Sequence, residues 1–187
     1  MNKENIIFLG IINSAEEFYE ITGKNFFELK QQEFNEDPAI YNDKQVIITE
    51  EEIKQYFGNY KDIKELREIA IKYFAKNIQG KTFDIGKFKN IRISRKSRDK
   101  YESFSMDERK LQIIPKLLEI LKNSTYKDSS GKYKDRKDHI TIFHYFTNRV
   151  ILKGNIYNVY ITIGEDENGK LFYDLDKNDN KNKKPRK

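Results

Sequence analysis

The chain has 187 residues, and its 36 basic and 30 acidic side chains give a formal net charge of +6. Because it contains no cysteine, a disulfide framework, a thiol nucleophile and a cysteine-based zinc site are excluded. Charged residues make up 35% of the chain, but 12 tyrosines and 13 phenylalanines offer apolar surface for a core. A folded domain is predicted. It is expected to be soluble, because the N-terminal apolar run is too short to span a bilayer.

The first 60 residues have the pattern of short helices that begin with capping signals. The capping-box pattern occurs twice, in Ser14 with Glu17 and in Thr49 with Glu52. Gly23 and Gly58 lie where these helices would end. The segment 36–49 between them is typical of a loop with a short strand.

The middle of the chain is also mainly helical by pattern. Asp62 with Glu65 begins the strongest helix, which Gly80 would close. Residues 81–94 then predict a loop or hairpin that leads into a strand. In the helical pattern over 105–124, Pro115 would remove a backbone hydrogen bond, so two helices are expected, the second starting at Pro115.

The last part of the chain alternates apolar and polar residues, which is typical of strands. Residues 126–138 predict a charged loop or an irregular hairpin, and the runs "HITIFHYF", "NIYNVYITI" and "KLFYDL" predict an antiparallel meander. The predicted fold class is α+β: N-terminal helices followed by a small, roughly four-stranded antiparallel sheet with helices packed on one face. The predicted domains are a helical module over 1–60, an α+β domain over 61–178 and a disordered basic tail over 179–187.

Both histidines lie in the first of these strands. Regular alternation places His139, Tyr145 and Arg149 on one face, and His144 among the apolar residues of the other. Tyr160 of the next strand would join the first face. That polar face could bind a phosphodiester, or it could simply be the solvated face of an antiparallel sheet. His144 could equally be a structural residue held by one hydrogen bond.

A basic stretch precedes these strands. The run "GKFKNIRISRKSRDK" contains a single acidic residue, and it could either hold phosphates or form a solvated basic face. Its candidate nucleic-acid-binding residues are Arg92, Arg95, Lys96 and Arg98, to which Tyr160 is added from the sheet.

Other chemistries find little support in the sequence. No phosphate-cradling glycine loop is present, and no ligand spacing implies a metal, so neither a metal nor a cofactor is expected. RNA cleavage without a metal requires only a base, an acid and a positive clamp, because the 2′-hydroxyl of the substrate is the nucleophile. The candidate catalytic residues for this reaction are His139, His144, Lys100, Arg149 and Tyr145.

The order of these motifs resembles the nuclease-like domains of large polyvalent proteins from phages and other mobile elements. The resemblance spans roughly 64–176 and rests on "GKTFDIGKFKNIRISRKSRDK", "IIPKLLEILKNS", "DHITIFHYFTNRV", "NIYNVYITIGED" and "GKLFYDL". It implies the compact α+β fold of the barnase, EndoU, colicin and RelE-like ribonucleases. By position, it also implies site residues at Ser94, Ser97, Lys100, His139, Tyr145 and Arg149.

Two functions are consistent with these features. The first is a metal-independent endoribonuclease, a toxin or phage effector in the cytoplasm of a bacterial host, delivered by phage or by secretion and held in check by an acidic protein inhibitor. The second is a catalytically inactive protein of the same fold. As a protein of a mobile element, it would use its basic face to bind nucleic acid or a defence complex of the host. RNA is the expected partner in the first case, and no membrane partner is expected in either.

Overall fold

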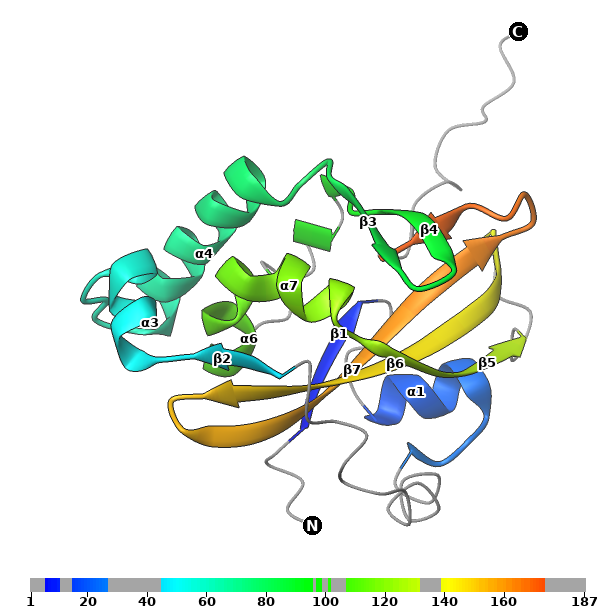
Figure 1. Cartoon of the computed structure of the whole chain (residues 1–187), viewed down its shortest axis with the longest axis horizontal. Helices are drawn as coiled ribbons and strands as arrows, with labels where there is room; N and C mark the ends of the chain where they lie inside the picture. Colours follow the sequence, from blue (N-terminus) through cyan, green and yellow to red (C-terminus); the bar gives the residue numbers. More distant parts are fainter. Residues whose placement is uncertain are drawn as a thin grey trace, which may run out of the picture.

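The computed structural model describes residues 6–10, 15–26, 45–95, 97–98, 101, 107–131 and 139–173. Within these residues, strands and helices follow one another as Figure 1 shows. In order they are β1 (Ile6–Gly10), α1 (Ala15–Thr22), β2 (Val46–Ile48), α3 (Glu50–Phe57), α4 (Ile63–Asn77), β3 (Thr82–Ile85), β4 (Phe88–Arg92), α6 (Glu108–Gln112), the 3₁₀ helix η3 (Ile114–Lys116), α7 (Leu117–Lys122), β5 (Thr125–Gly131), β6 (Ile140–Leu152), β7 (Asn155–Asp166) and β8 (Leu171–Phe172).

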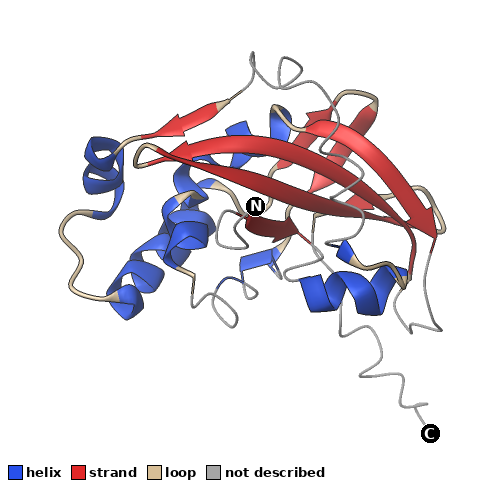
Figure 2. Cartoon of the chain, turned by 90° about the horizontal axis from the view of Figure 1, so that it is seen from below, coloured by secondary structure: helices blue, strands red, loops and turns tan. Residues whose placement is uncertain are grey.

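All eight strands belong to a single mixed sheet. Its main order is β2-β6-β7-β8-β4-β3, with β1 also paired to β7 and β5 also paired to β6. The antiparallel pair β6 and β7 forms its long, arching centre (Figure 2). The prediction of a small, roughly four-stranded antiparallel sheet is therefore wrong. It failed because the first 60 residues were not expected to join this sheet. β1 and β2, the second of them in the segment predicted as a loop with a short strand, pair in parallel with β7 and β6.

The sheet separates two hydrophobic clusters. Ile7 and Leu9 of β1 belong to the larger cluster, with residues of α3, α4 and α7. Ile6 and Phe8, whose side chains alternate with them, belong to the smaller cluster, together with Phe18 of α1. Helices thus cover both faces, and the prediction of helices on one face is also wrong. We call the side of the larger cluster the helix face, and the other side the α1 face.

The capping signals locate the helix starts well. Thr49 and Glu52 form both bonds of the predicted capping box at α3, and the side chain of Asp62 caps α4. Gly58 follows α3 as predicted, but α4 ends at Asn77, before Gly80. The predicted cap Ser14 lies outside the described residues.

Pro115 divides the second helical region, as predicted. Helix α6 ends at Gln112, and Pro115 lies in η3, which leads directly into α7. The region 126–138, predicted as a charged loop or irregular hairpin, is described only to Gly131. This part belongs to β5, which pairs with β6 and shifts register between Tyr126 and Asp128. The sequence of β5 is polar, so it lacks the apolar alternation that would predict a strand. Among the described residues, no helix is long and apolar enough to cross a membrane.

Candidate nucleic-acid interface

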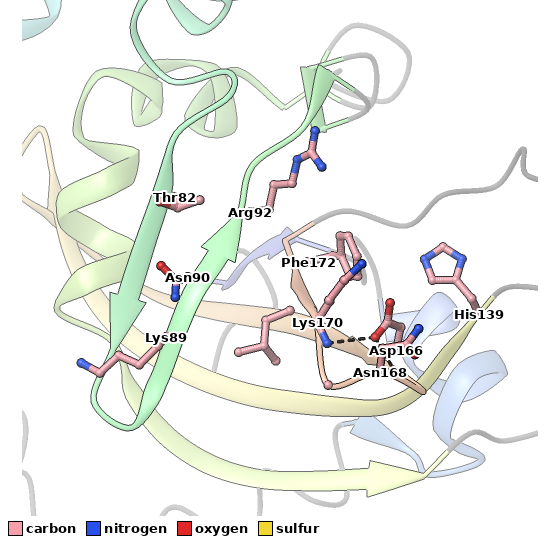
Figure 3. A pocket seen from close by; sticks show the side chains of 11 residues that line it. Thr82, Lys89, Asn90, Arg92, His139, Asp166, Asn168, Lys170 and Phe172 are labelled. Carbon is pink, nitrogen blue, oxygen red and sulfur yellow. Dashed lines mark hydrogen bonds between the residues drawn. The ribbon is translucent and has the colours of Figure 1, made fainter.

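An open pocket of about 790 Å³ lies at the end of the sheet where β4 and β8 meet (Figure 3). Three segments that are distant in the sequence form its walls: the β3–β4 hairpin, the start of β6 and the turn from β7 to β8. The lining residues are Thr82, Lys89, Asn90, Arg92, His139, Asp166, Asn168, Gly169, Lys170, Leu171 and Phe172. Arg92 pairs with Phe172 across β4 and β8, which brings the hairpin to the turn.

The lining is rich in cations. Lys89, Arg92 and Lys170 come from two different walls, and His139 adds an imidazole. Arg92 and Lys170 are exposed, so their charges face solvent in the open pocket. This distribution makes the pocket a place where an anion of phosphate type would be stabilised.

Asp166 is the one carboxylate in the pocket lining, and backbone groups bind it. It is buried, and its Oδ1 accepts hydrogen bonds from the backbone N–H groups of Asn168 and Lys170, both at 2.9 Å (Figure 3). These bonds fix the turn that carries Lys170. The carboxylate therefore builds the wall of the pocket.

The β3–β4 hairpin is shaped by a local contact at Asn90. This residue has a positive φ of 57°, a conformation in which asparagine is favoured among non-glycine residues. Its backbone N–H donates to Asp84 at 2.9 Å, and Asp84 also pairs with Lys89 at 3.3 Å. The Asn90 hydrogen bond and then Lys89 lower the pKa of Asp84. The hairpin conformation places Lys89 and Asn90 at the pocket.

The two histidines have different surroundings. The His139 ring meets the edge of Phe172, with ring centroids 5.6 Å apart, in the pocket. His144 instead packs against Phe88 on the helix face, and its Nε2 lies 2.6 Å from Glu165. His144 is 7% exposed, so its surroundings are those of a packed, hydrogen-bonded side chain.

A bulge changes the alternation near the start of β6. The register with β7 shifts between Ile140 and Ile142, so Ile140 and Phe143 both pack in the cluster of the α1 face. Regular alternation would instead put Ile140 on the face of His144. Phe143 keeps the face of Tyr145 and is fully buried there.

Tyr145 and Tyr160 lie on the α1 face, which the alternation had presented as polar. Phe18 packs 5.5 Å from the ring of Tyr145, and Phe26 packs 4.8 Å from that of Tyr160. The Tyr145 hydroxyl lies 2.5 Å from the Ser130 hydroxyl. Burial raises the pKa of Tyr145 to about 12, although the Ser130 hydrogen bond acts in the opposite direction. The structure thus places both tyrosines in an aromatic cluster.

The structure does not bring Arg149 to the histidine of the pocket. Ten residues of extended chain separate Arg149 from His139, which corresponds to roughly 33 Å along the strand. Arg149 pairs with Asn158 near the far end of β6. His139 and Arg149 therefore cannot contact the same phosphate in this conformation.

The residues of the basic stretch have different positions. Arg92 lines the pocket, Arg95 is exposed and Arg98 is half-buried. Ser97 is buried and Ser94 half-buried. Lys96 and Lys100 lie outside the described residues. Of the predicted site residues, the structure brings Arg92 and His139 together.

Sequence reasoning missed one wall of the pocket. The turn "EDENGK", which provides Asp166, Asn168 and Lys170, carried only a turn signal. This turn has an asparagine and a glycine directly before a lysine, and it lies between two strands. That pattern could have indicated a polar turn that exposes a cation. Among the described residues, no group of histidine and carboxylate side chains could hold a metal ion.

The family model for large polyvalent protein-associated domain 3 matches residues 61–173. This match spans more than half of the chain, and the chain belongs to this family. The association with polyvalent proteins, implied by the resemblance, is confirmed, whereas membership of the ribonuclease superfamily stays a prediction. No match was found among curated proteins or among solved structures. The match begins at residue 61, although β1 and β2 before it are strands of the same sheet.

Proposed function

We propose that the protein binds RNA and holds its phosphodiester backbone in the pocket between β4 and the β7–β8 turn. The observation that carries this proposal is the lining itself. Arg92 and Lys170 line one open pocket with Lys89, whose Nζ pairs with Asp84. The one carboxylate in the lining is already bound by backbone N–H groups.

The physical basis is electrostatic. Lysine and arginine that neutralise phosphates release condensed counterions, so affinity depends on charge and falls with salt. Asn90 and Asn168 add amide groups to the same lining, and such groups donate hydrogen bonds to phosphate oxygens and sugars. The pocket thus offers charge and donors together.

Charge reversal tests the proposal. We expect the Arg92→Glu, Lys170→Glu double variant to lose at least tenfold in affinity for a fluorescent RNA oligonucleotide, measured by anisotropy at fixed salt. The matched control is Lys72→Glu with Lys76→Glu, two exposed lysines of α4, which changes the net charge equally. Equal losses in both double variants would show that binding depends on net charge and not on the pocket, and would contradict the proposal.

Metal-independent RNA cleavage is the second candidate function, and His139 is the observation that favours it. His139 lines the same pocket as Arg92 and Lys170, so it could exchange a proton with a bound phosphodiester. Such cleavage also needs a second proton-transfer group. The carboxylate of Asp166 already accepts hydrogen bonds from the backbone of the β7–β8 turn. For this reason, binding is the function that the pocket supports better.

Cleavage has its own test. Incubation of the protein with total RNA and tRNA in EDTA, followed by mapping of new ends, would reveal 2′,3′-cyclic phosphates if the reaction occurs. These ends should be absent with His139→Ala and present with His144→Gln. If the RNA is bound but stays intact, the cleavage function is contradicted and the binding function remains. An acidic inhibitor or a host complex as protein partner stays a prediction.

A further inference from the structure

We infer that the RNA bound by the pocket is single-stranded, and that a base outside the pocket stacks on Tyr126 beside Lys87. This inference rests on the proposed function. It concerns a second contact area, formed by an aromatic ring and a cation at the tip of the β3–β4 hairpin.

Tyr126 is an exposed aromatic side chain on an otherwise polar strand. It lies in β5, and 39% of its surface is exposed. Its ring packs against Phe88 and Phe146, with centroids 5.2 and 5.6 Å away. These contacts hold the ring in place, while the remaining surface stays open to solvent. A fixed, exposed ring is the platform on which unpaired bases stack.

A cation accompanies this ring. The Nζ of Lys87 lies 5.5 Å from the ring centroid of Tyr126 and 5.4 Å from that of Phe88. Lysine beside an aromatic platform can pair with the phosphate of the nucleotide whose base stacks there. Tyr126 and Lys87 thus place an aromatic ring beside a cation, the two kinds of group that bind single-stranded nucleic acid.

The hairpin connects this platform to the pocket. From Lys87 to Arg92 the chain advances five residues, which is about 17 Å of strand. Lys89 and Asn90, between them, already line the pocket. A stacked strand advances about 3.4 Å per nucleotide, so roughly five nucleotides separate the two contacts.

The platform selects for single strands. In a duplex, both faces of each internal base are covered by its neighbours, whereas an unpaired base can turn toward a side chain. Tyr126 can therefore contribute to affinity only when the nucleic acid has free bases. A duplex would retain the phosphate contacts and lose the stacking contact.

The test compares RNA lengths and Tyr126 variants by fluorescence anisotropy. Wild-type protein should bind an eight-nucleotide oligouridylate more tightly than a three-nucleotide one, and more tightly than an eight-base-pair RNA duplex. Tyr126→Ala should weaken binding of the eight-nucleotide strand about fivefold or more, the lower range for one stacked base. It should leave the three-nucleotide strand unaffected, and Tyr126→Phe should bind as wild type does.

Two further variants make the result decisive. Tyr19→Ala removes another exposed tyrosine, on α1, and should bind normally. Tyr126→Leu keeps an apolar group against Phe88 and Phe146 without an aromatic face, so it replaces Tyr126→Ala if that variant does not fold. Full affinity of folded Tyr126→Leu for the eight-nucleotide strand, or equal affinity for the duplex, would overturn the inference while leaving the pocket proposal intact. Absence of RNA binding by the wild-type protein would overturn both.

Discussion

Single side chains in this protein have roles that the alternation pattern alone does not reveal. Alternation correctly places His144 among apolar side chains, and the structure packs it against Phe88 on the helix face. It misplaces Ile140, which packs on the α1 face instead of the face of His144, because the bulge inserts an extra residue into β6. A bulge depends on pairing with β7, and a single strand carries no signal for it.

The pair formed by His144 and Glu165 should contribute to stability. Glu165→Ala would leave the nearly buried Nε2 of His144 without its 2.6 Å partner. We expect a loss of about 1–3 kcal/mol in the free energy of unfolding, measured with urea. Glu167→Ala, an exposed carboxylate two residues away, is the control. Equal stability of the two variants would mean that the contact contributes nothing.

Tyr145 should make stability depend on alkaline pH. Its pKa is about 12 in the folded protein and about 10 in an unfolded chain. Below pH 10 both states hold the proton, so stability is unaffected. Between pH 10 and 12 the unfolded chain ionises while the folded protein does not, so the free energy of unfolding falls. Tyr145→Phe should lose less stability over this interval in parallel urea titrations, and an identical pH dependence would contradict the assignment.

Elements with strong local signals were predictable, and elements defined by pairing were not. The caps of α3 and α4 need only side chains within three residues, and Pro115 acts on its own helix. β1 and β2 each need a partner more than one hundred residues away. β5 is polar because it lies at an edge, and a polar strand resembles a loop.

The close approach of β1 to β7 should make Gly10 difficult to replace. Gly10 has a φ of 88°, and a Cβ atom there would lie 2.3 Å from the carbonyl oxygen of Thr162. Gly10→Ala should cost at least about 1–2 kcal/mol for the left-handed backbone alone, measured by urea unfolding. Gly131→Ala, at a strand position with open space, should change stability by less than about 0.5 kcal/mol. Similar values for both would show that β1 adjusts freely.

At the scale of the whole molecule, the sheet unites segments from both ends of the chain. β1 and β2 precede the residues matched by the family model, yet they pair with its two central strands. The pocket likewise combines walls about eighty residues apart in sequence. Periodicity predicts which side chains share a face of one element, but not which distant elements pack together. The sequence therefore indicated the basic stretch of the pocket, but not the β7–β8 turn that forms the opposite wall.

Removal of residues 1–60 should therefore disrupt folding of the remainder. The truncated chain would expose Val159 and Ile161 of β7, which the intact protein buries against β1 and the adjoining helices. We expect residues 61–187 alone to show no cooperative thermal transition, whereas the intact chain shows one. A cooperative transition with native circular dichroism in the fragment would establish that 61–187 folds independently.

The most direct test of RNA binding at the pocket is to locate the RNA on the protein. An eight-nucleotide RNA containing 4-thiouridine would be cross-linked by light to the intact chain, and the modified peptides would be identified by mass spectrometry. The account predicts cross-links in the peptides that contain Arg92, Tyr126 and Phe172, which Lys170→Glu should reduce. Cross-links confined to α3 and α4, or unchanged by Lys170→Glu, would contradict it.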